Sequence, residues 1–196
     1  MMSLSLEASA YIDTLNSKKH VLQVITDKIK GESAQFQFIK NGLTLGEKCI
    51  YFVHEDPSKV ISRMKKAGLD TERFTKSGLL QIHRVPNVLS EADPFAAFQS
   101  FFASIVKNPS ERFRLVGRSI NDLRNKKAWD LAIQIERFMH SNFEQMNATV
   151  LCYYDYQKLD SKHTIQHVGE LMKCHHGAIF STLSEPNLAL EFDRPT

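Results

Sequence analysis

The sequence lacks any hydrophobic run long enough to cross a membrane. Its longest apolar stretches, such as Thr149–Tyr154, have the length of a strand, whereas a transmembrane helix needs about 20 apolar residues in succession. The N-terminal segment, MMSLSLEASAYIDTLNSKKH, carries an early acidic residue and has neither a basic start nor an apolar core, so it does not have the features of a signal peptide. We therefore expect a cytoplasmic protein that does not associate with a membrane.

Cysteine is scarce, and charge of neither sign is concentrated. The three cysteines, Cys49, Cys152 and Cys174, are odd in number and far apart, which favours reduced, buried thiols over a disulfide framework. The chain has 25 Lys and Arg against 22 Asp and Glu, spread along its length, and a net charge of +3. This weak excess argues against direct nucleic-acid binding. The 196 residues, 42% of them hydrophobic, are enough for one domain with its own core.

Glycine is scarce where a phosphate-binding loop would need it. The segment after the first expected strand, VITDKIKGESAQF, has one glycine, Gly31, and no Gly-Lys-Ser/Thr. Asp27 and Glu32 stand where backbone N–H groups and a lysine would have to surround phosphates. No G-x-G-x-x-G occurs in the chain either. The sequence thus argues against Walker-type ATP hydrolysis and against dinucleotide binding.

The sequence does contain a regular alternation of strand and helix patterns. Strands are predicted at residues 20–25, 48–55, 78–85, 112–119, 149–155 and 177–183. Helices are predicted at residues 28–41, 57–67, 93–108, 126–145 and 160–175, the first of them ended by Gly42. Because several strands are apolar on both faces, we predict an α/β fold with three layers, a mostly parallel sheet covered by helices on both faces.

The N-terminal segment stands apart from this alternation. Over residues 4–16 one helical face collects Leu4, Ala8, Tyr11, Ile12 and Leu15. We therefore divide the chain into an N-terminal amphipathic helix, residues 1–17, and one main domain, residues 18–196. The helix is expected either to pack on the main domain or to pair with another subunit.

Several short motifs then occur in a recognisable order. They are the strand that begins at His20, FIKNGLTLGEKCIYF, the AGLD and SGLLQI turns, FRLVGR, IERFM, VLCYYD and HHGAI. In this order and spacing, over about residues 18–190, the chain resembles the MEDS domain, the methanogen/methylotroph sensory domain. It departs from the family pattern in its N-terminal helix and at His176, where a proline commonly follows the histidine.

The resemblance implies a relative of the KaiC/RecA-like ATPase fold that has lost its phosphate loop and senses a small molecule. Members of the family occur alone, fused to DNA-binding domains, or in signalling proteins such as histidine kinases, and their proposed ligands are small hydrocarbon derivatives. We expect no fused output domain, and we therefore expect the signal to pass to a separate partner protein or through a homo-oligomer. No cofactor is expected.

A topological rule selects the candidate ligand-binding residues. In an open α/β sheet, ligands bind beyond the carboxyl ends of the strands, near the switch in strand order. Applied here, the rule selects Thr26, Asp27, His54, Glu55, Arg118, Ser119, Tyr154 and Asp155. Arg118 is the most specific of these candidates, because a guanidinium can bind a carboxylate or phosphate through two hydrogen bonds. The alternative is that these residues are helix caps or solvated strand ends, with Arg118 paired to Glu55 or Asp155.

Three further residues are interpreted as structural. Trp129, the only tryptophan, is expected in the core. Glu136 lies among apolar residues of a helix and matches the helix glutamate of the family. His20 opens the first strand, at the end opposite the expected pocket.

The histidines near the C-terminus are the low-ranked alternative for a metal site. His163 and His167 are four residues apart, and Cys174, His175 and His176 follow. Because the segment has neither H-E-x-x-H nor C-x-x-C, we expect no metal site.

Catalysis has little support in the sequence. Cys152 lies in a strand expected to be buried and has no base near it in sequence, and no G-x-S-x-G elbow occurs. The sequence therefore predicts a non-catalytic domain that binds a small organic molecule and relays it to a partner. Two alternatives stay open: a nucleotide- or phosphate-binding module without a P-loop, and a metal-dependent enzyme that uses the C-terminal histidines.

Overall fold

The computed structural model describes residues 6–16, 18–183 and 188–192. Within these residues, eight strands form one sheet in the order β1-β8-β7-β2-β6-β5-β3-β4. The strands are β1 (Leu6–Glu7), β2 (Lys19–Ile25), β3 (Lys48–Val53), β4 (Leu80–Arg84), β5 (Phe113–Gly117), β6 (Ala148–Asp155), β7 (Gly177–Ser181) and β8 (Leu188–Glu191). The sheet is parallel from β7 to β4, whereas β8 runs antiparallel to β7 and β1 antiparallel to β8.

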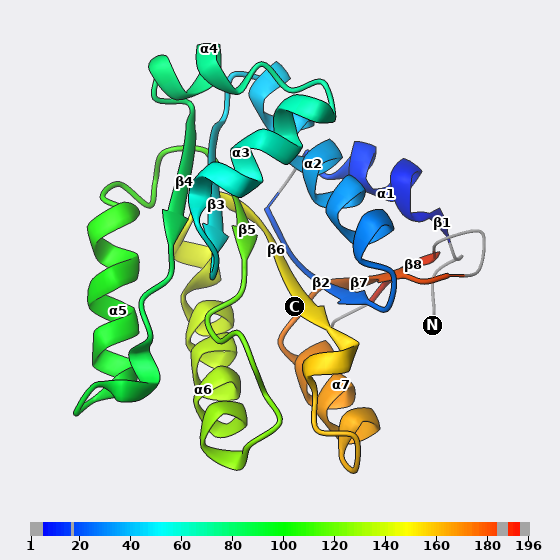
Figure 1. Cartoon of the computed structure of the whole chain (residues 1–196), viewed down its shortest axis with the longest axis vertical. Coiled ribbons are helices and arrows are strands. Elements are labelled where there is room, and N and C mark those ends of the chain that lie inside the picture. The colour runs from blue at the N-terminus through cyan, green and yellow to red at the C-terminus, as the bar shows by residue number, and fades with distance from the viewer. Residues whose placement is uncertain (1–5, 17, 184–187, 193–196) are drawn as a thin grey trace.

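Helices cover both faces of the sheet (Figure 1). One face carries α1 (Ala8–Thr14), α2 (Lys28–Thr44) and α3 (Pro57–Lys66), and the other carries α5 (Pro94–Ile105), α6 (Lys126–Asn142) and α7 (Thr164–Lys173). The short helix α4 (Thr71–Lys76) leads into β4, and single 3₁₀ turns lie at Val88–Ser90, Phe143–Gln145 and Tyr156–Lys158. The predicted α/β fold with a mostly parallel, doubly covered sheet is confirmed.

The alternation of side chains along each strand divides the hydrophobic core into two parts. In β3, Tyr51 belongs to the core beneath α1, α2 and α3, whereas its neighbour Phe52 belongs to the core beneath α5, α6 and α7. Trp129 of α6 is buried in the second of these, as predicted. Because the central strands are covered on both sides, their sequences are apolar at nearly every position.

The N-terminal helix is packed against the body of the fold. Tyr11 and Ile12 of α1 are buried in the same core as Phe38 of α2. Asp13 accepts hydrogen bonds from Gln37 (2.8 Å) and Asn41 (2.7 Å) of α2. Leu4, part of the predicted apolar face, lies outside the described residues.

The end of α2 differs from the prediction. Gly42 does not end the helix, which continues to Thr44, and the chain turns instead at Gly46, with a φ of 74°. Gly42 serves close packing: a Cβ at this position would lie 2.5 Å from Cδ of Arg114 and 2.7 Å from Sγ of Cys49. The C-terminal helix is also shorter than predicted, since α7 begins only at Thr164.

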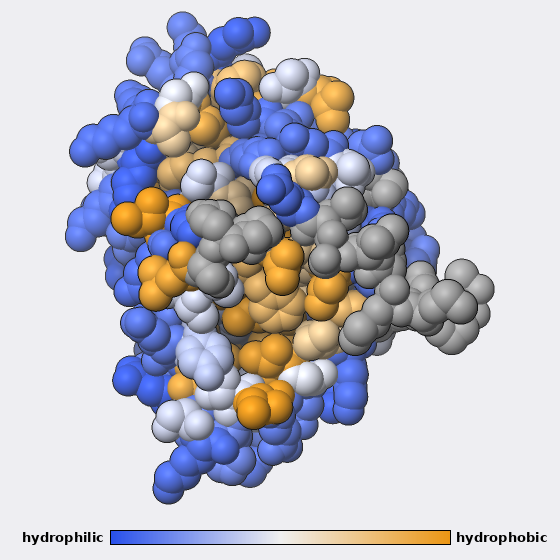
Figure 2. All heavy atoms as spheres, turned by 90° about the vertical axis from the view of Figure 1, so that its right-hand side faces the viewer, coloured by the Kyte–Doolittle hydropathy of each residue, from blue (hydrophilic) through white to orange (hydrophobic). Residues whose placement is uncertain are grey.

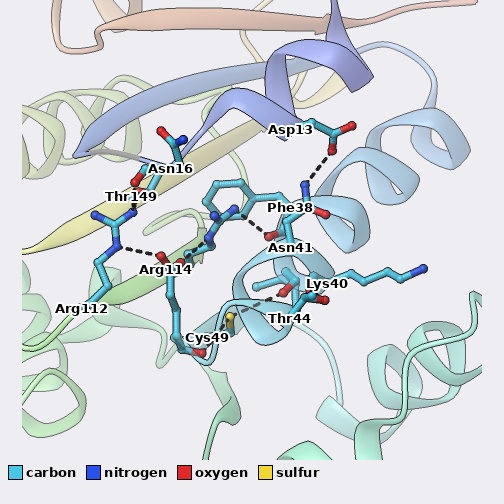
Figure 3. Close-up of polar contacts among 12 residues, drawn as sticks. Asp13, Asn16, Phe38, Lys40, Asn41, Thr44, Cys49, Arg112, Arg114 and Thr149 are labelled. Atoms are coloured by element: carbon cyan, nitrogen blue, oxygen red, sulfur yellow. Dashed lines mark hydrogen bonds and ion pairs between the residues drawn. The ribbon is translucent and has the colours of Figure 1, made fainter.

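A buried ion network holds the amino ends of β3 and β5 together. Nε of Arg114, a residue only 1% exposed, donates to Glu47 at 2.5 Å, and Nε of Arg112 donates to the other oxygen of the same carboxylate at 2.8 Å. Arg114 also donates to the carbonyl of Phe38 at 3.1 Å. Figure 3 shows Arg114 beside Phe38 and Asn41 of α2, and Arg112 on the side of Asn16 and Thr149. These contacts compensate the burial of the guanidinium.

The edge formed by β1 and β8 presents a partly hydrophobic surface. Figure 2 shows hydrophobic side chains gathered on part of this face, among polar ones. Leu188 of β8 is 43% exposed. In the described part of the chain, no helix combines the length and the apolar character that crossing a membrane requires.

Candidate functional site

A pocket of about 470 Å³ lies at the carboxyl ends of β2, β3, β5 and β6. This volume falls within the range of small-molecule sites, about 300–1,000 Å³. Apolar lining comes from Ile25, Val53 and Val60, and the aromatic lining from Tyr51 and Tyr153. The charged side chains are Lys28, Glu32, Glu55, Arg63, Arg118, Asp155 and Lys158.

The structure brings some of the predicted ligand-binding residues together here and not others. His54, Glu55, Arg118 and Asp155 line the pocket, whereas Ser119 lines a neighbouring pocket of about 570 Å³ that also contains His54. Thr26, Asp27 and Tyr154 are not part of the lining. Whether the lining residues bind a ligand stays a prediction.

Tyr154 is absent from the pocket because of strand geometry. Successive residues of β6 face opposite sides of the sheet, so Tyr153 lines the pocket while Tyr154 is buried in the core beneath α6. The hydroxyl of Tyr154 donates to Oε1 of Glu136. The topological rule therefore selected a strand end that borders the pocket, but the residue that lines the pocket is the neighbour, Tyr153.

Asp27 acts as the N-cap of α2. Its carboxylate accepts from the backbone N–H groups of Ile29 (2.9 Å) and Lys30 (3.2 Å). These groups belong to the helix terminus that a phosphate loop would turn towards its ligand. Asp27 therefore occupies two of the N–H groups of this terminus, and its carboxylate would repel an anion there.

Arg63 is neutralised by two carboxylates of the pocket. Its Nε lies 2.8 Å from Glu32 and its second terminal nitrogen 2.5 Å from Glu55. The hydrogen bonds that Arg63 donates to Glu55 and to Glu32 raise the pKa of Arg63 above its ordinary value. Glu55 is therefore paired with Arg63, and not with Arg118 as one sequence interpretation allowed.

The positive charge of Arg118 faces the pocket and has no carboxylate partner among the described residues. It donates to the side-chain oxygen of Asn121 at 2.5 Å, and its guanidinium carbon lies 5.0 Å from the centre of the Tyr153 ring. Among the described residues, no carboxylate forms an ion pair with Arg118, and its buried Nε has no hydrogen-bond partner. Lys158 shares Asn121 as a partner at 2.8 Å, and burial followed by the charge of Arg118 lowers the pKa of Lys158.

His54 is held neutral beside Arg118. Its Nε2 lies 3.1 Å from the backbone oxygen of Arg118, and burial, followed by the Arg118 charge, lowers the pKa of His54 to about 4. At neutral pH the imidazole therefore donates to this carbonyl and adds no charge to the pocket.

A chain of buried hydrogen bonds starts at Tyr51 and Gln35, which line the pocket. The hydroxyl of Tyr51 donates to Gln35, Gln35 donates to Gln23 at 2.9 Å, and Gln23 donates to the hydroxyl of Ser181 at 2.9 Å. The chain links β3, α2, β2 and β7. Sequence reasoning missed it, although a glutamine inside the apolar run HVLQVI was a signal.

The C-terminal histidines, named above as the low-ranked alternative for a metal site, do not come together in one place. His163 is exposed, with Nδ1 2.6 Å from Asp160, while His167 stacks on Trp129 with ring centres 3.7 Å apart. His176 accepts the backbone N–H of His20 at 3.0 Å through Nδ1, and Cys174 caps the end of α7. Of these residues, His175 alone belongs to a group of possible metal ligands within the described part of the chain.

A group of four possible metal ligands consists of His20, Glu136, Cys152 and His175, all buried on the α6 side of the sheet. Each offers one ligand atom, and these atoms lie within 4.8 Å of one another. Sequence reasoning interpreted His20 and Glu136 as structural and found no base near Cys152. In the fold, Nε2 of His20 lies 3.2 Å from Sγ of Cys152.

Comparisons with known proteins agree with this fold and place the chain in a family. A KaiC-like protein from the archaeon Pyrococcus horikoshii OT3 has a similar structure, with a TM-score of 0.58 and 18% sequence identity, over 84% of this chain and 71% of that chain. A search of curated protein sequences gave no match. The sequence model of the methanogen/methylotroph, DcmR sensory domain matches residues 19–176. The KaiC/RecA-like character of the fold is thereby confirmed, and the chain belongs to the MEDS sensory-domain family.

Proposed function

We propose that this domain binds a small organic molecule with an acidic group in the pocket at the carboxyl ends of β2, β3, β5 and β6. Membership of a sensory-domain family supports a sensing role. The observation that carries the proposal is Arg118, which faces the pocket without a carboxylate partner among the described residues. A guanidinium in this state binds an anionic oxygen through charge-assisted hydrogen bonds.

The rest of the pocket defines the kind of ligand. The acidic group would lie between Arg118 and Lys158, and the organic part would contact the Tyr153 ring and the apolar side chains of Val53 and Val60. The opposing charges, Glu32 and Glu55, are bound by Arg63. They would repel a second anionic group, which favours a ligand with one charge over a nucleotide polyphosphate.

The same geometry supports binding without catalysis. The imidazole next to Arg118 belongs to His54, whose pKa of about 4 leaves it with little basicity at neutral pH. Cys152, the nucleophile candidate, is buried on the other face of the sheet and does not line the pocket.

We infer that binding is relayed to a partner protein or to a second copy of the chain. Two elements support a relay. The loop that carries Arg118 and Asn121 also lines the neighbouring pocket, and the chain of buried hydrogen bonds that starts at Tyr51 reaches β7. Ordering of Arg118 by a ligand would therefore affect two surfaces of the domain.

Thermal-shift measurements on the full chain test the proposal. A panel would contain small monocarboxylates, neutral alcohols of the same size, inorganic phosphate and ATP. A ligand present at 100 times its Kd stabilises the folded state by about 2.7 kcal/mol. We expect a monocarboxylate to raise the Tm, and Arg118→Ala to abolish the rise. Arg124→Ala is the matched control, because Arg124 is exposed and paired with Asp122.

The outcomes separate the alternatives. Stabilisation by ATP or phosphate that Arg118→Ala abolishes would establish the nucleotide- or phosphate-binding module instead. Stabilisation that survives Arg118→Ala would place the ligand elsewhere and contradict the proposed site. If no compound in a panel of small acids raises the Tm, the proposal of an acidic ligand fails.

A further inference from the structure

A cluster on the opposite face of the sheet has the composition of a transition-metal site. His20 comes from β2, Cys152 from β6 and Glu136 from α6, and His175 lies between α7 and β7. The ligand atoms are two imidazole nitrogens, one sulfur and one carboxylate oxygen. Imidazole and thiolate are the ligands that zinc prefers, and a carboxylate is a frequent third type.

Three of the separations between the ligand atoms are close to those around a tetrahedral ion. Nε2 of His20 lies 3.2 Å from Sγ of Cys152 and 3.4 Å from Oε2 of Glu136, and Nε2 of His175 lies 3.5 Å from the same oxygen. With Zn–N and Zn–O bonds near 2.1 Å and Zn–S near 2.3 Å, tetrahedral geometry separates ligand atoms by about 3.3–3.6 Å. The two contacts with Oε2 of Glu136 have those lengths, and the contact between His20 and Cys152 is shorter.

Direct hydrogen bonding accounts for the contact between His20 and Cys152 but explains the distances to Glu136 less well. Charge-assisted bonds between an imidazolium and a carboxylate have lengths of about 2.7–2.9 Å. Both histidines lie further than this from Oε2 of Glu136, and one nitrogen of His20 approaches the sulfur and the oxygen together. Such an arrangement, in which several ligand atoms surround one point, is the one that coordination requires.

The surrounding groups orient the ligands for coordination. Nδ1 of His175 lies 2.6 Å from the carbonyl oxygen of Leu171. In the neutral ring, Nδ1–H donates to this carbonyl, and the lone pair is on Nε2, which faces the cluster. The hydroxyl of Tyr154 holds Oε1 of Glu136 and leaves Oε2 towards the histidines. The ring of Phe143 stacks on His20 with centres 5.8 Å apart.

We propose that His20, Glu136, Cys152 and His175 bind one Zn²⁺-class ion between the sheet and α6. A thiolate and a carboxylate together neutralise the divalent charge, which a buried site requires. On binding, the thiol of Cys152 gives its proton to the solvent and the sulfur forms a bond to the metal. Four protein ligands complete a tetrahedral shell, so the site is a structural or metal-sensing centre and not a hydrolytic one. The ligand atoms lie on the face of the sheet opposite the pocket at Arg118.

Metal content and cobalt spectroscopy test the site. The full chain, purified without a histidine tag and stripped with a chelator, would be titrated with Zn²⁺ alone and with Co²⁺ alone. We expect one ion per chain, an increase in Tm on loading, and a thiolate-to-cobalt absorption band. Cys152→Ser removes the band and weakens binding by at least about 100-fold. Tyr154→Phe, which changes only the residue that positions Glu136, weakens binding by about 10–100-fold and keeps the band.

Matched variants control for other sites and for folding. Cys49→Ser replaces an equally buried cysteine in the other core and is expected to keep the ion and the band. The double variant His163→Gln, His167→Gln removes the exposed histidine pair and is expected to bind one ion as the unchanged chain does. Circular dichroism of each metal-free variant checks that it is folded. If Cys152→Ser does not fold, the test rests on Tyr154→Phe, which should keep the absorption band and bind the metal more weakly. The proposal is overturned by the absence of stoichiometric binding, by a band that persists in folded Cys152→Ser, or by loss of the ion in the histidine double variant.

Discussion

Gly42 of α2 packs against the buried side chain of Arg114 so closely that a Cβ at Gly42 would lie 2.5 Å from Cδ of Arg114. The same Cβ would lie 2.7 Å from Sγ of Cys49. Arg114 cannot give way easily, because it is held by Glu47 and by the carbonyl of Phe38. The absent side chain thus lets α2 approach the sheet at the point where the ion network is built.

Gly42→Ala is therefore expected to destabilise the protein, although alanine favours helix over glycine by about 1 kcal/mol. Overpacking of this kind costs about 1–3 kcal/mol. Gly169→Ala is the matched control, since Gly169 lies in α7 and a Cβ there would have nothing within 4 Å. Urea denaturation should give a lower midpoint for Gly42→Ala and an unchanged or higher one for Gly169→Ala. A stabilised Gly42→Ala would show that the contact with Arg114 relaxes without cost.

Glu47→Gln tests the ion network itself. The substitution keeps the size of the side chain but leaves Arg114 buried without a carboxylate, and loss of one partner of a buried pair costs about 3–5 kcal/mol. Asp122→Asn is the control, because it removes the partner of the exposed Arg124, and no measurable loss is expected. The free energies of unfolding in urea check both. Equal effects of the two substitutions would contradict a structural role for the network.

The fold was predictable from the sequence because the patterns that specify it are local. Apolar runs such as KCIYFV and TVLCYY predict buried parallel strands, and Asp93 followed by Pro94 predicts the start of α5. The short strands β1 and β8 were missed, because two to four residues at a sheet edge carry no clear periodicity. Gly42 was misinterpreted because a glycine that serves packing looks in sequence like one that ends a helix.

The candidate sites were predictable only in part. Arg118 and Asp155 follow from the rule of strand ends, but TVLCYYD is apolar on both faces and so does not say whether Tyr153 or Tyr154 faces the pocket. The cluster of possible metal ligands was not predictable. His20 and Cys152 are 132 positions apart, and only the parallel register of β2 with β6 brings them together.

Trp129 should report on the protonation of His167. The two rings are stacked with centres 3.7 Å apart, and protonated histidine quenches tryptophan fluorescence at contact. Burial lowers the pKa of His167 below 6.5, so the quenching is expected to develop below that pH. Steady-state fluorescence of the only tryptophan measures it directly. His167→Gln should remove the transition, whereas His163→Gln should leave it; a transition that survives His167→Gln would assign the quenching to another group.

His54 should make the stability of the domain depend on pH in a defined window. Its pKa is lowered from 6.5 in the unfolded chain to about 4 in the folded one, first by burial and then by Arg118. Between these values the unfolded state binds the proton more tightly, so the contribution is complete above pH 6.5 and is lost as the pH falls towards 4. The full loss is on the order of 3 kcal/mol.

The measurement is the free energy of unfolding in urea at several pH values from 7.5 to 4.5, for the unchanged chain and for His54→Gln. Other groups contribute to both curves, so the difference between the curves isolates His54. We expect the unchanged chain to lose more stability than the variant as the pH falls, because glutamine at this position takes up no proton. Parallel curves would mean that His54 is accessible enough to be protonated in the folded state. The neutral imidazole assigned to the pocket beside Arg118 would then be wrong.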